Sequence, residues 1–182
     1  MAEPDEVTRL ALAAAAGDRT ALSEFIRRTQ SDVWRFIARL ADPGIADDLT
    51  QETYLRVLPA LASFEGRSSA RSWLLAIARR VVVDRIRHDA SRPRLSGANW
   101  SAITDSLLAS TSQVSALEAE ELLGHLEPDR REALVLTQLM GFSYAEAAEI
   151  AGCPVGTIRS RVARARADLV AAVERQRAEA GS

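Results

Sequence analysis

One stretch, residues 141–169 with the sequence GFSYAEAAEIAGCPVGTIRSRVARARADL, constrains the fold more than any other part of the chain. Ser143 can cap a helix, and Glu146 three residues later completes the pattern of a capping box. Gly152 ends that helix, and Pro154 stands where a first-turn proline opens the next one. The stretch therefore predicts two helices joined by a short turn, which is a helix-turn-helix.

The second of these helices has one apolar side and one basic side. A helical wheel places four apolar residues on a single stripe: Ile158, Val162, Ala165 and Leu169. Such a stripe predicts burial against other helices. The rest of the surface carries small or basic residues: Thr157, Arg159, Ser160, Arg161, Ala163, Arg164 and Arg166. Small residues let a helix approach base edges, while Ser and Arg can hydrogen-bond to bases or phosphates. The pattern favours a DNA recognition helix, and a solvated amphipathic helix is the alternative.

Three motifs together resemble the extracytoplasmic-function (group IV) sigma factors of bacterial RNA polymerase. CPVGTIRSRVARAR at 153–166 is similar to their region 4.2, and DLTQETYLRV at 48–57 is similar to region 2.2. FEGRSSARSWLLAIARR at 64–80 is similar to regions 2.3 and 2.4. The motifs come in the family order at the family spacing and span most of the chain. The sigma-C type is the nearest branch.

The apolar periodicity predicts an all-α fold of two small helical domains joined by a flexible linker. Residues 1–90 read as a four-helix unit, which the resemblance identifies as sigma region 2. Residues 91–113 are rich in Ser and lack a sustained apolar period, so we expect the linker there. Residues 114–182 form the second unit, identified by the resemblance as sigma region 4.

Helix boundaries follow from the same periodicity and from Gly and Pro. The expected helices of the first unit are 7–16, 19–40, 45–58 and about 69–88, the third ending before Pro59. In the second unit, Pro128 opens a helix that ends at Gly141, just before the helix-turn-helix.

The distribution of charge, rather than its sum, indicates a nucleic-acid partner. The net charge is -2, yet residues 67–94 hold eight arginines against two aspartates. All basic residues are Arg, which suits phosphate and base contacts. Cys153 is the only cysteine, which excludes an intramolecular disulfide and a thiolate zinc cluster. No signal peptide or membrane span is evident, so we expect a soluble cytoplasmic protein without a membrane partner.

One helix face within the DLTQET motif is a candidate polymerase-docking surface. Its members recur at helical spacing and are Asp48, Gln51, Glu52 and Leu55, with Arg56 beside them. The resemblance implies that this face binds the clamp-helix coiled coil of the largest polymerase subunit. Two alternatives are a solvated face with local ion pairs and a metal site on Asp47, Asp48 and Glu52, as in a nucleic-acid enzyme.

Residues 64–87 are the expected site of strand opening. Opening a duplex costs about 1.4 kcal/mol of stacking per base-pair step. A protein without ATP can offset this cost only by binding the opened strand more tightly than the duplex. The resemblance implies that the polar loop captures a flipped base of the -10 element while arginines contact the strand. The candidate residues are Phe64, Glu65, Gly66, Arg67, Ser68, Ser69, Arg71, Trp73, Arg79, Arg80 and Arg87. For the two aromatic residues, packing in the core is the alternative.

The resemblance as a whole implies a sigma factor that binds RNA polymerase core and directs initiation at specific promoters. Recognition of the -35 element would fall to Tyr144, Thr157, Arg159, Ser160, Arg161, Ala163, Arg164 and Arg166. Implied partners are the clamp helices of the largest polymerase subunit, the flap of the second-largest subunit, and promoter DNA. An anti-sigma factor is a candidate partner, although the sequence displays no binding site for one.

We expect no cofactor, no metal and no enzymatic activity, because phosphodiester chemistry belongs to the polymerase. The alternative from a different class is a stand-alone helix-turn-helix regulator with an unrelated N-terminal domain. Such a regulator would bind promoter DNA tightly by itself.

Overall fold

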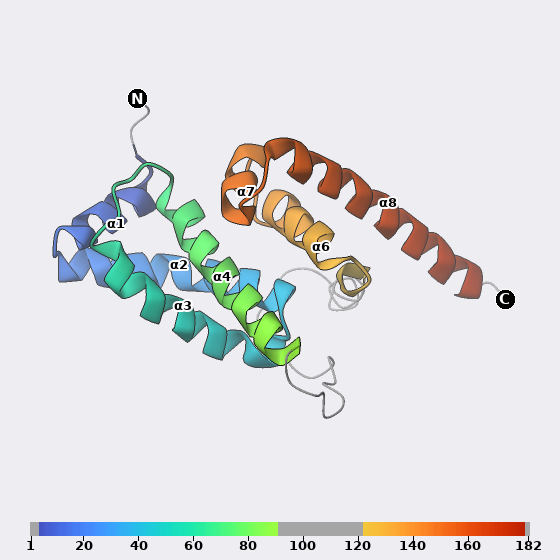
Figure 1. The fold of residues 1–182 in the computed structure, drawn as a ribbon, viewed down its shortest axis with the longest axis horizontal. Helices are drawn as coiled ribbons and strands as arrows, with labels where there is room; N and C mark the ends of the chain where they lie inside the picture. Colours follow the sequence, from blue (N-terminus) through green and yellow to red (C-terminus); the bar gives the residue numbers. More distant parts are fainter. Residues whose placement is uncertain (1–3, 91–121, 181–182) are drawn as a thin grey trace. The chain divides into compact units, whose positions relative to one another are not determined.

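The computed structural model describes residues 4–90 and 122–180 and divides the chain into two compact units, Met1–Ser96 and Gly97–Ser182 (Figure 1). Every regular element in the described part is a helix, so the predicted all-α class is confirmed. The predicted linker, residues 91–113, lies outside the described residues. No helix in the described part is both long and apolar enough to cross a membrane.

Within residues 4–90 the first unit holds four α-helices: α1 (Glu6–Ala15), α2 (Arg19–Leu40), α3 (Ala46–Leu61) and α4 (Ala70–Ala90). A short 3-10 turn, η1 (Pro43–Ile45), precedes α3. Asp5 and Asp18 cap α1 and α2, because their side chains accept hydrogen bonds from backbone N–H groups of the first turn.

The core of the first unit is built from the inward faces of α2, α3 and α4. Its largest fully buried side chains are Phe25, Val33, Phe36, Ile37, Leu49, Val57, Leu74, Leu75 and Val81. Burying a side chain of this kind contributes roughly 1.5–3 kcal/mol relative to leaving it exposed. This core fixes which faces of α3 and α4 remain available to partners.

The third helix runs past the proline that was expected to stop it. α3 includes Pro59 and ends at Leu61, so the predicted end before Pro59 is wrong. Proline removes a backbone donor, yet near the C-terminal end only one helical hydrogen bond is lost. Val57 and Leu61 are almost fully buried and lie one turn apart, so packing holds the last turn in place.

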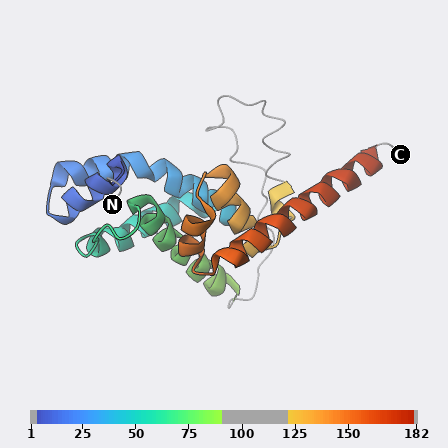
Figure 2. The ribbon, with the colours of Figure 1, turned by 90° about the horizontal axis from the view of Figure 1, so that it is seen from above.

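The second unit contains a short helix, a π-helical turn and the two helices of the predicted helix-turn-helix. These are α6 (Pro128–Leu134), the turn η3 (Val135–Leu139), α7 (Tyr144–Ala151) and α8 (Val155–Ala180). Pro128 begins α6 as predicted, and Gly141 follows the turn with a φ of 74°. Figure 2 shows α8 as one continuous helix whose C-terminal part extends beyond α7.

The local signals of the helix-turn-helix are confirmed with one shift. Ser143 and Glu146 form a reciprocal capping box, and Gly152 ends α7 in the left-handed conformation with a φ of 63°. Pro154 directly precedes α8 instead of occupying its first turn, and its carbonyl accepts the backbone N–H of Thr157 and of Ile158. The expected position was wrong by one residue.

The apolar stripe of α8 is buried as predicted over about its first three turns. Ile158, Val162 and Ala165 are at most 1% exposed, whereas Leu169 is only half-buried. Ala172 continues the buried stripe. The opposite side of the helix is therefore fixed outward.

Candidate nucleic-acid interface

The outward side of α8 presents the small and basic residues that the sequence singled out. Arg159, Ser160, Ala163 and Arg164 are exposed, and Thr157 is half-buried. The hydroxyl of Ser160 donates to the carbonyl oxygen of Thr157 at 2.9 Å, one turn earlier in the helix. Arg159 and Arg164 can therefore approach base edges, because only the small side chains of Ser160 and Ala163 lie between them on the exposed side.

Two other arginines of α8 make contacts within their own unit. Arg161 donates to the carboxylate of Asp129 at the start of α6 and, at 3.7 Å, to the sulfur of Cys153. Arg166 donates to the side-chain oxygen of Gln138 at 2.8 Å. These two side chains therefore tie α8 to α6 and to the turn that follows it.

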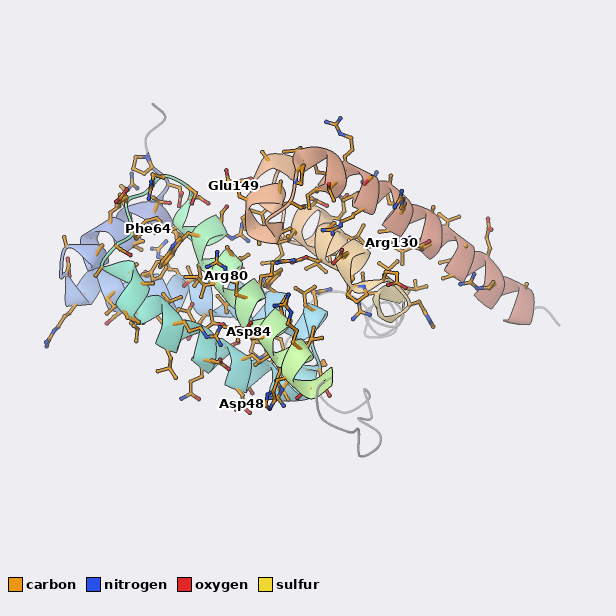
Figure 3. The ribbon with its side chains drawn as sticks, viewed as in Figure 1. Asp48, Phe64, Arg80, Asp84, Arg130 and Glu149 are labelled. Carbon is orange, nitrogen blue, oxygen red and sulfur yellow. The ribbon has the colours of Figure 1, made fainter. Side chains whose placement is uncertain are left out.

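A further ion pair connects α8 to α6. Arg130, labelled in Figure 3, donates to Asp168 at 2.6 Å, across 38 residues of sequence. Sequence reasoning missed Asp129 and Asp168, because no spacing rule connects residues so far apart in the chain. Tyr144, the remaining predicted residue of this surface, is half-buried in the first turn of α7.

The candidate strand-opening loop connects α3 to α4 and is closed on one side by aromatic packing. Phe64 is 8% exposed, and its ring centroid lies 4.9 Å from that of Trp73, with the planes tilted by 45°. Trp73 is half-buried. The burial of Phe64 supports the core-packing alternative for this residue, while Trp73 stays partly exposed.

The polar part of the loop ends in a cap on α4. The backbone N–H of Ser72 donates to the side-chain oxygen of Ser69 at 3.1 Å, so Ser69 caps the helix.

Arg67 is highly exposed and pairs with Glu65 at 3.2 Å. Gly66 adopts a φ of 69°, in the left-handed region that side chains other than glycine rarely adopt. Ser68 is half-buried.

The arginines of α4 fall into two groups by direction. Trp73, Arg80 and Arg87 are seven residues apart and share one face, on which both arginines are exposed (Figure 3 labels Arg80). Arg71 lies on the other side, where its Nε donates to Asp32 of α2 at 2.7 Å. Arg79 is half-buried on the flank.

The predicted docking face on α3 is exposed and includes an apolar residue that the sequence analysis omitted. Asp48 and Gln51 are exposed, Glu52 is half-buried, and Leu55 is 64% exposed. Leu58 extends the same face and is 42% exposed. Its spacing of three from Leu55 is the signal that could have found it.

Arg56 joins this face to α4. It donates to Glu52 at 2.5 Å and to Asp84 of α4 at 2.7 Å. The hydrogen bond that Arg56 donates to Asp84 is the main cause that raises the pKa of Arg56 above its ordinary value. Asp84 and Asp48 are labelled in Figure 3 on α4 and at the beginning of α3.

Two of the three carboxylates that a metal site would need are engaged by protein donors. Asp47 accepts a hydrogen bond from the indole N–H of Trp34 at 2.8 Å, and Glu52 pairs with Arg56. Over residues 4–90 and 122–180, no group of three or more His, Cys, Asp or Glu is arranged to hold a metal ion.

Comparison with known proteins identifies two matching family models. Residues 25–92 match the model of sigma-70 region 2, and residues 116–169 match sigma-70 region 4. The chain is 55% identical over 173 residues to the ECF RNA polymerase sigma factor SigC of Mycobacterium tuberculosis, covering 94% of each chain. It is 32% identical over 162 residues to the sigma-E factor of Escherichia coli, covering 82% of this chain and 85% of that one.

Two solved structures are similar in fold. The structure of CnrH in complex with the cytosolic domain of CnrY has a TM-score of 0.72 and 26% identity, covering 93% of this chain and 98% of that one. The sigma factor RpoE of Bartonella quintana, in complex with the anti-sigma factor NepR, has a TM-score of 0.66 and 29% identity, covering 84% and 96%.

Proposed function

Because the chain belongs to the extracytoplasmic-function sigma factors of the sigma-70 family, we propose that its two helical units divide promoter recognition between them. The chain binds RNA polymerase core and directs promoter-specific transcription initiation. Residues 1–90 act as region 2, which docks on core and opens the -10 element. Residues 114–182 act as region 4, which reads the -35 element, and residues 91–113 link the two. The main support for this proposal is that the region 2 match falls on the first compact unit and the region 4 match on the second.

Region 4 reads the -35 element through the outward side of α8. Ser160 and Arg164 lie opposite the buried stripe, so they meet base edges in the major groove. Arg159 and Thr157 lie beside them, and Tyr144 contacts the backbone from the start of α7. Arg161 and Arg166 hold the helix in place and reach phosphates only by giving up contacts within the unit.

Region 2 opens the -10 element by capturing an unstacked base in the loop between α3 and α4. Residues 65–69 form this loop, and the half-buried Trp73 offers an aromatic ring for stacking, a contact that suits any base. Arg80 and Arg87 continue the same face along α4 and attract the phosphates of the opened strand. The start of α4 lies at the loop, and its helix dipole also favours negative charge there.

Core polymerase docks on the exposed face of α3. Asp48, Gln51 and Leu55 point away from the core of region 2, and Leu58 adds to the apolar centre of the face. An apolar centre rimmed by polar groups is the usual composition of a protein interface. We place the clamp helices of the largest subunit on this face, and the flap of the second-largest subunit on region 4.

The chain contributes no bond-making chemistry of its own in this proposal. Phosphodiester formation belongs to the polymerase, so the chain is a non-enzymatic initiation factor. It works where bacterial RNA polymerase works, in the cytoplasm. The complex of RpoE with the anti-sigma factor NepR supports the proposal that this chain is also subject to an anti-sigma protein.

The stand-alone regulator is the rival that the family membership argues against. Run-off transcription on a genomic promoter library separates the two, because the proposed function requires both components. We expect discrete transcripts from core polymerase plus the protein and none from either alone. Unchanged transcript selectivity of core on every template would reject the proposed function, and tight specific promoter binding by the free protein would favour the regulator.

A further inference from the structure

We propose that Thr8 of α1 is a positioning residue for the base-capturing loop, an inference that rests on the function proposed above. The loop, residues 62–69, leaves α3 and runs over α1 before α4 begins (Figure 1). No motif in the sequence connects α1 with strand opening. The connection comes from two contacts between α1 and the loop.

The first contact is a buried hydrogen bond at the junction of the loop and α4. The backbone N–H of Ala70, the first residue of α4, donates to Oγ1 of Thr8 at 2.9 Å. The Thr8 hydroxyl donates in turn to a carboxylate oxygen of Asp5 at 2.6 Å. An amide N–H only donates and a carboxylate only accepts, so the direction of both bonds is fixed. Thr8 is 3% exposed and Ala70 is fully buried, so water has little access to this junction.

The second contact lies one helical turn further along α1, in the middle of the loop. A Cβ built on Gly66 would stand 3.4 Å from Cδ2 and 3.5 Å from Cδ1 of Leu12. The side of Gly66 that lacks a side chain therefore faces the Leu12 side chain, at about one methyl group's distance. Phe64 and Trp73 close the loop at the beginning of the same segment. The loop is thus supported at its beginning, its middle and its end.

This support bears on strand opening because an ordered loop binds its ligand without a further ordering cost. A loop that had to become ordered on meeting the base would lose that conformational entropy at the moment of capture. Loss of the Thr8 oxygen leaves the buried N–H of Ala70 without its acceptor, which is unfavourable where water has little access. The junction then shifts to regain a partner, and the capture geometry is lost while the rest of region 2 stays folded.

The test compares Thr8→Val, which keeps the shape and removes the hydroxyl, with Thr8→Ser, which keeps the hydroxyl. Thr20→Val makes the same chemical change at an exposed position of α2 and is the matched control. Each variant is assembled with core polymerase on a promoter selected by the wild-type protein. Permanganate reactivity of the -10 thymines then gives the ratio of open to closed complex, and duplex -35 binding and core affinity are measured in parallel.

We expect Thr8→Val to lower the open-to-closed ratio roughly twofold to tenfold, which is the change in an equilibrium constant expected when one hydrogen bond is lost. Thr8→Ser and Thr20→Val should match wild type, and a pre-opened -10 template should restore Thr8→Val. Core affinity and -35 binding should not change. Leu12→Ala removes the second support and should lower the ratio in the same way, which keeps the proposal testable if Thr8→Val does not fold.

Comparison with a loop variant separates failure of this inference from failure of the proposed function. The loop variant replaces Glu65, Arg67 and Ser68 with Ala. If it reduces opening while Thr8→Val and Leu12→Ala open the promoter like wild type, α1 does not position the loop, and the proposed function stands. If the loop variant itself opens the promoter normally, the proposed role of the loop is wrong. Equal losses of opening, core affinity and -35 binding in Thr8→Val would show general destabilisation and overturn the inference.

Discussion

Arg161 and Arg164 are three residues apart on α8, and we expect their replacement by alanine to have different consequences. Arg164 is exposed on the side opposite the buried stripe. Arg161 has a side chain that is 21% exposed and pairs with Asp129 of α6. Arg164→Ala should therefore change which -35 sequences are bound, whereas Arg161→Ala should mainly change the stability of region 4.

The expected magnitudes follow from these environments. Loss of a good base contact costs about 1–3 kcal/mol, which is roughly a 5-fold to 150-fold loss of affinity for the preferred base pair. Asp129 is 61% exposed, so solvent screening limits its pair with Arg161 to about 0–1 kcal/mol. Lost packing of the Arg161 stem adds to this. In a small domain, 1 kcal/mol lowers the melting temperature by about 4–8 °C.

The assay is fluorescence anisotropy on a set of -35 duplexes that carry each single base-pair substitution, with thermal melting of the same proteins. Arg164→Ala should bind two or more base pairs equally well at one position and melt like wild type. Arg161→Ala should keep the wild-type order of preference and melt earlier. If Arg161→Ala flattens the preference at one position while Arg164→Ala leaves all preferences unchanged, the orientation assigned to α8 is wrong.

Three further outcomes follow from the structure. Leu55→Ala should weaken binding to core polymerase without lowering stability, because Leu55 is 64% exposed. Leu49→Ala, at a fully buried site, should instead cost about 2–5 kcal/mol of folding free energy. If Leu55→Ala competes for core polymerase as well as wild type does, the docking face is wrong. Burial raises the pKa of Tyr54 to about 12, so the stability from its neutral phenol is complete below the ordinary pKa of 10.0 and is lost as pH rises toward 12. Titration of phenolate absorbance against a Tyr54→Phe variant measures this shift, and an unshifted transition would refute it. Arg159→Gln should reduce the slope of log affinity against log salt concentration by about 0.9 if Arg159 neutralises one phosphate. Arg161→Gln should reduce the slope less, because Arg161 is already paired within region 4. Equal reductions would show that these contacts do not keep Arg161 from the phosphates.

The fold was predictable from the sequence where local signals dominate. Ser143 with Glu146, Gly152 and Pro128 each placed a helix end, and the apolar stripe of α8 identified its buried side. The end of α3 was missed because burial of Leu61 outweighs the local effect of Pro59. Tertiary packing decided that boundary, and a single sequence does not show it.

The candidate sites were predictable as segments but less so as individual side chains. The motifs delimited three candidate segments, which are the basic part of α8, the loop between α3 and α4, and the exposed face of α3. Whether a given arginine points outward depends on partners far away in the sequence, such as Asp32 for Arg71 and Asp129 for Arg161. Leu58 was within reach of the spacing argument, whereas Thr8 was not, because its partner Ala70 is 62 residues away.

The side-chain contacts of α8 suggest how, in the proposed function, a chain with a net charge of -2 would favour selective over strong binding to DNA. Electrostatic attraction to phosphates does not depend on sequence, so every additional unpaired arginine strengthens binding to all DNA alike. In α8, the carboxylate of Asp129 offsets part of the positive charge of Arg161, while the neutral amide of Gln138 holds Arg166 by a hydrogen bond without offsetting its charge. Both contacts restrain the orientation of the helix. The exposed arginines then act from a rigid helix, where a displaced base contact cannot be replaced by another. We therefore expect α8 to gain selectivity at the expense of affinity, so that binding of the whole complex depends on the polymerase as well.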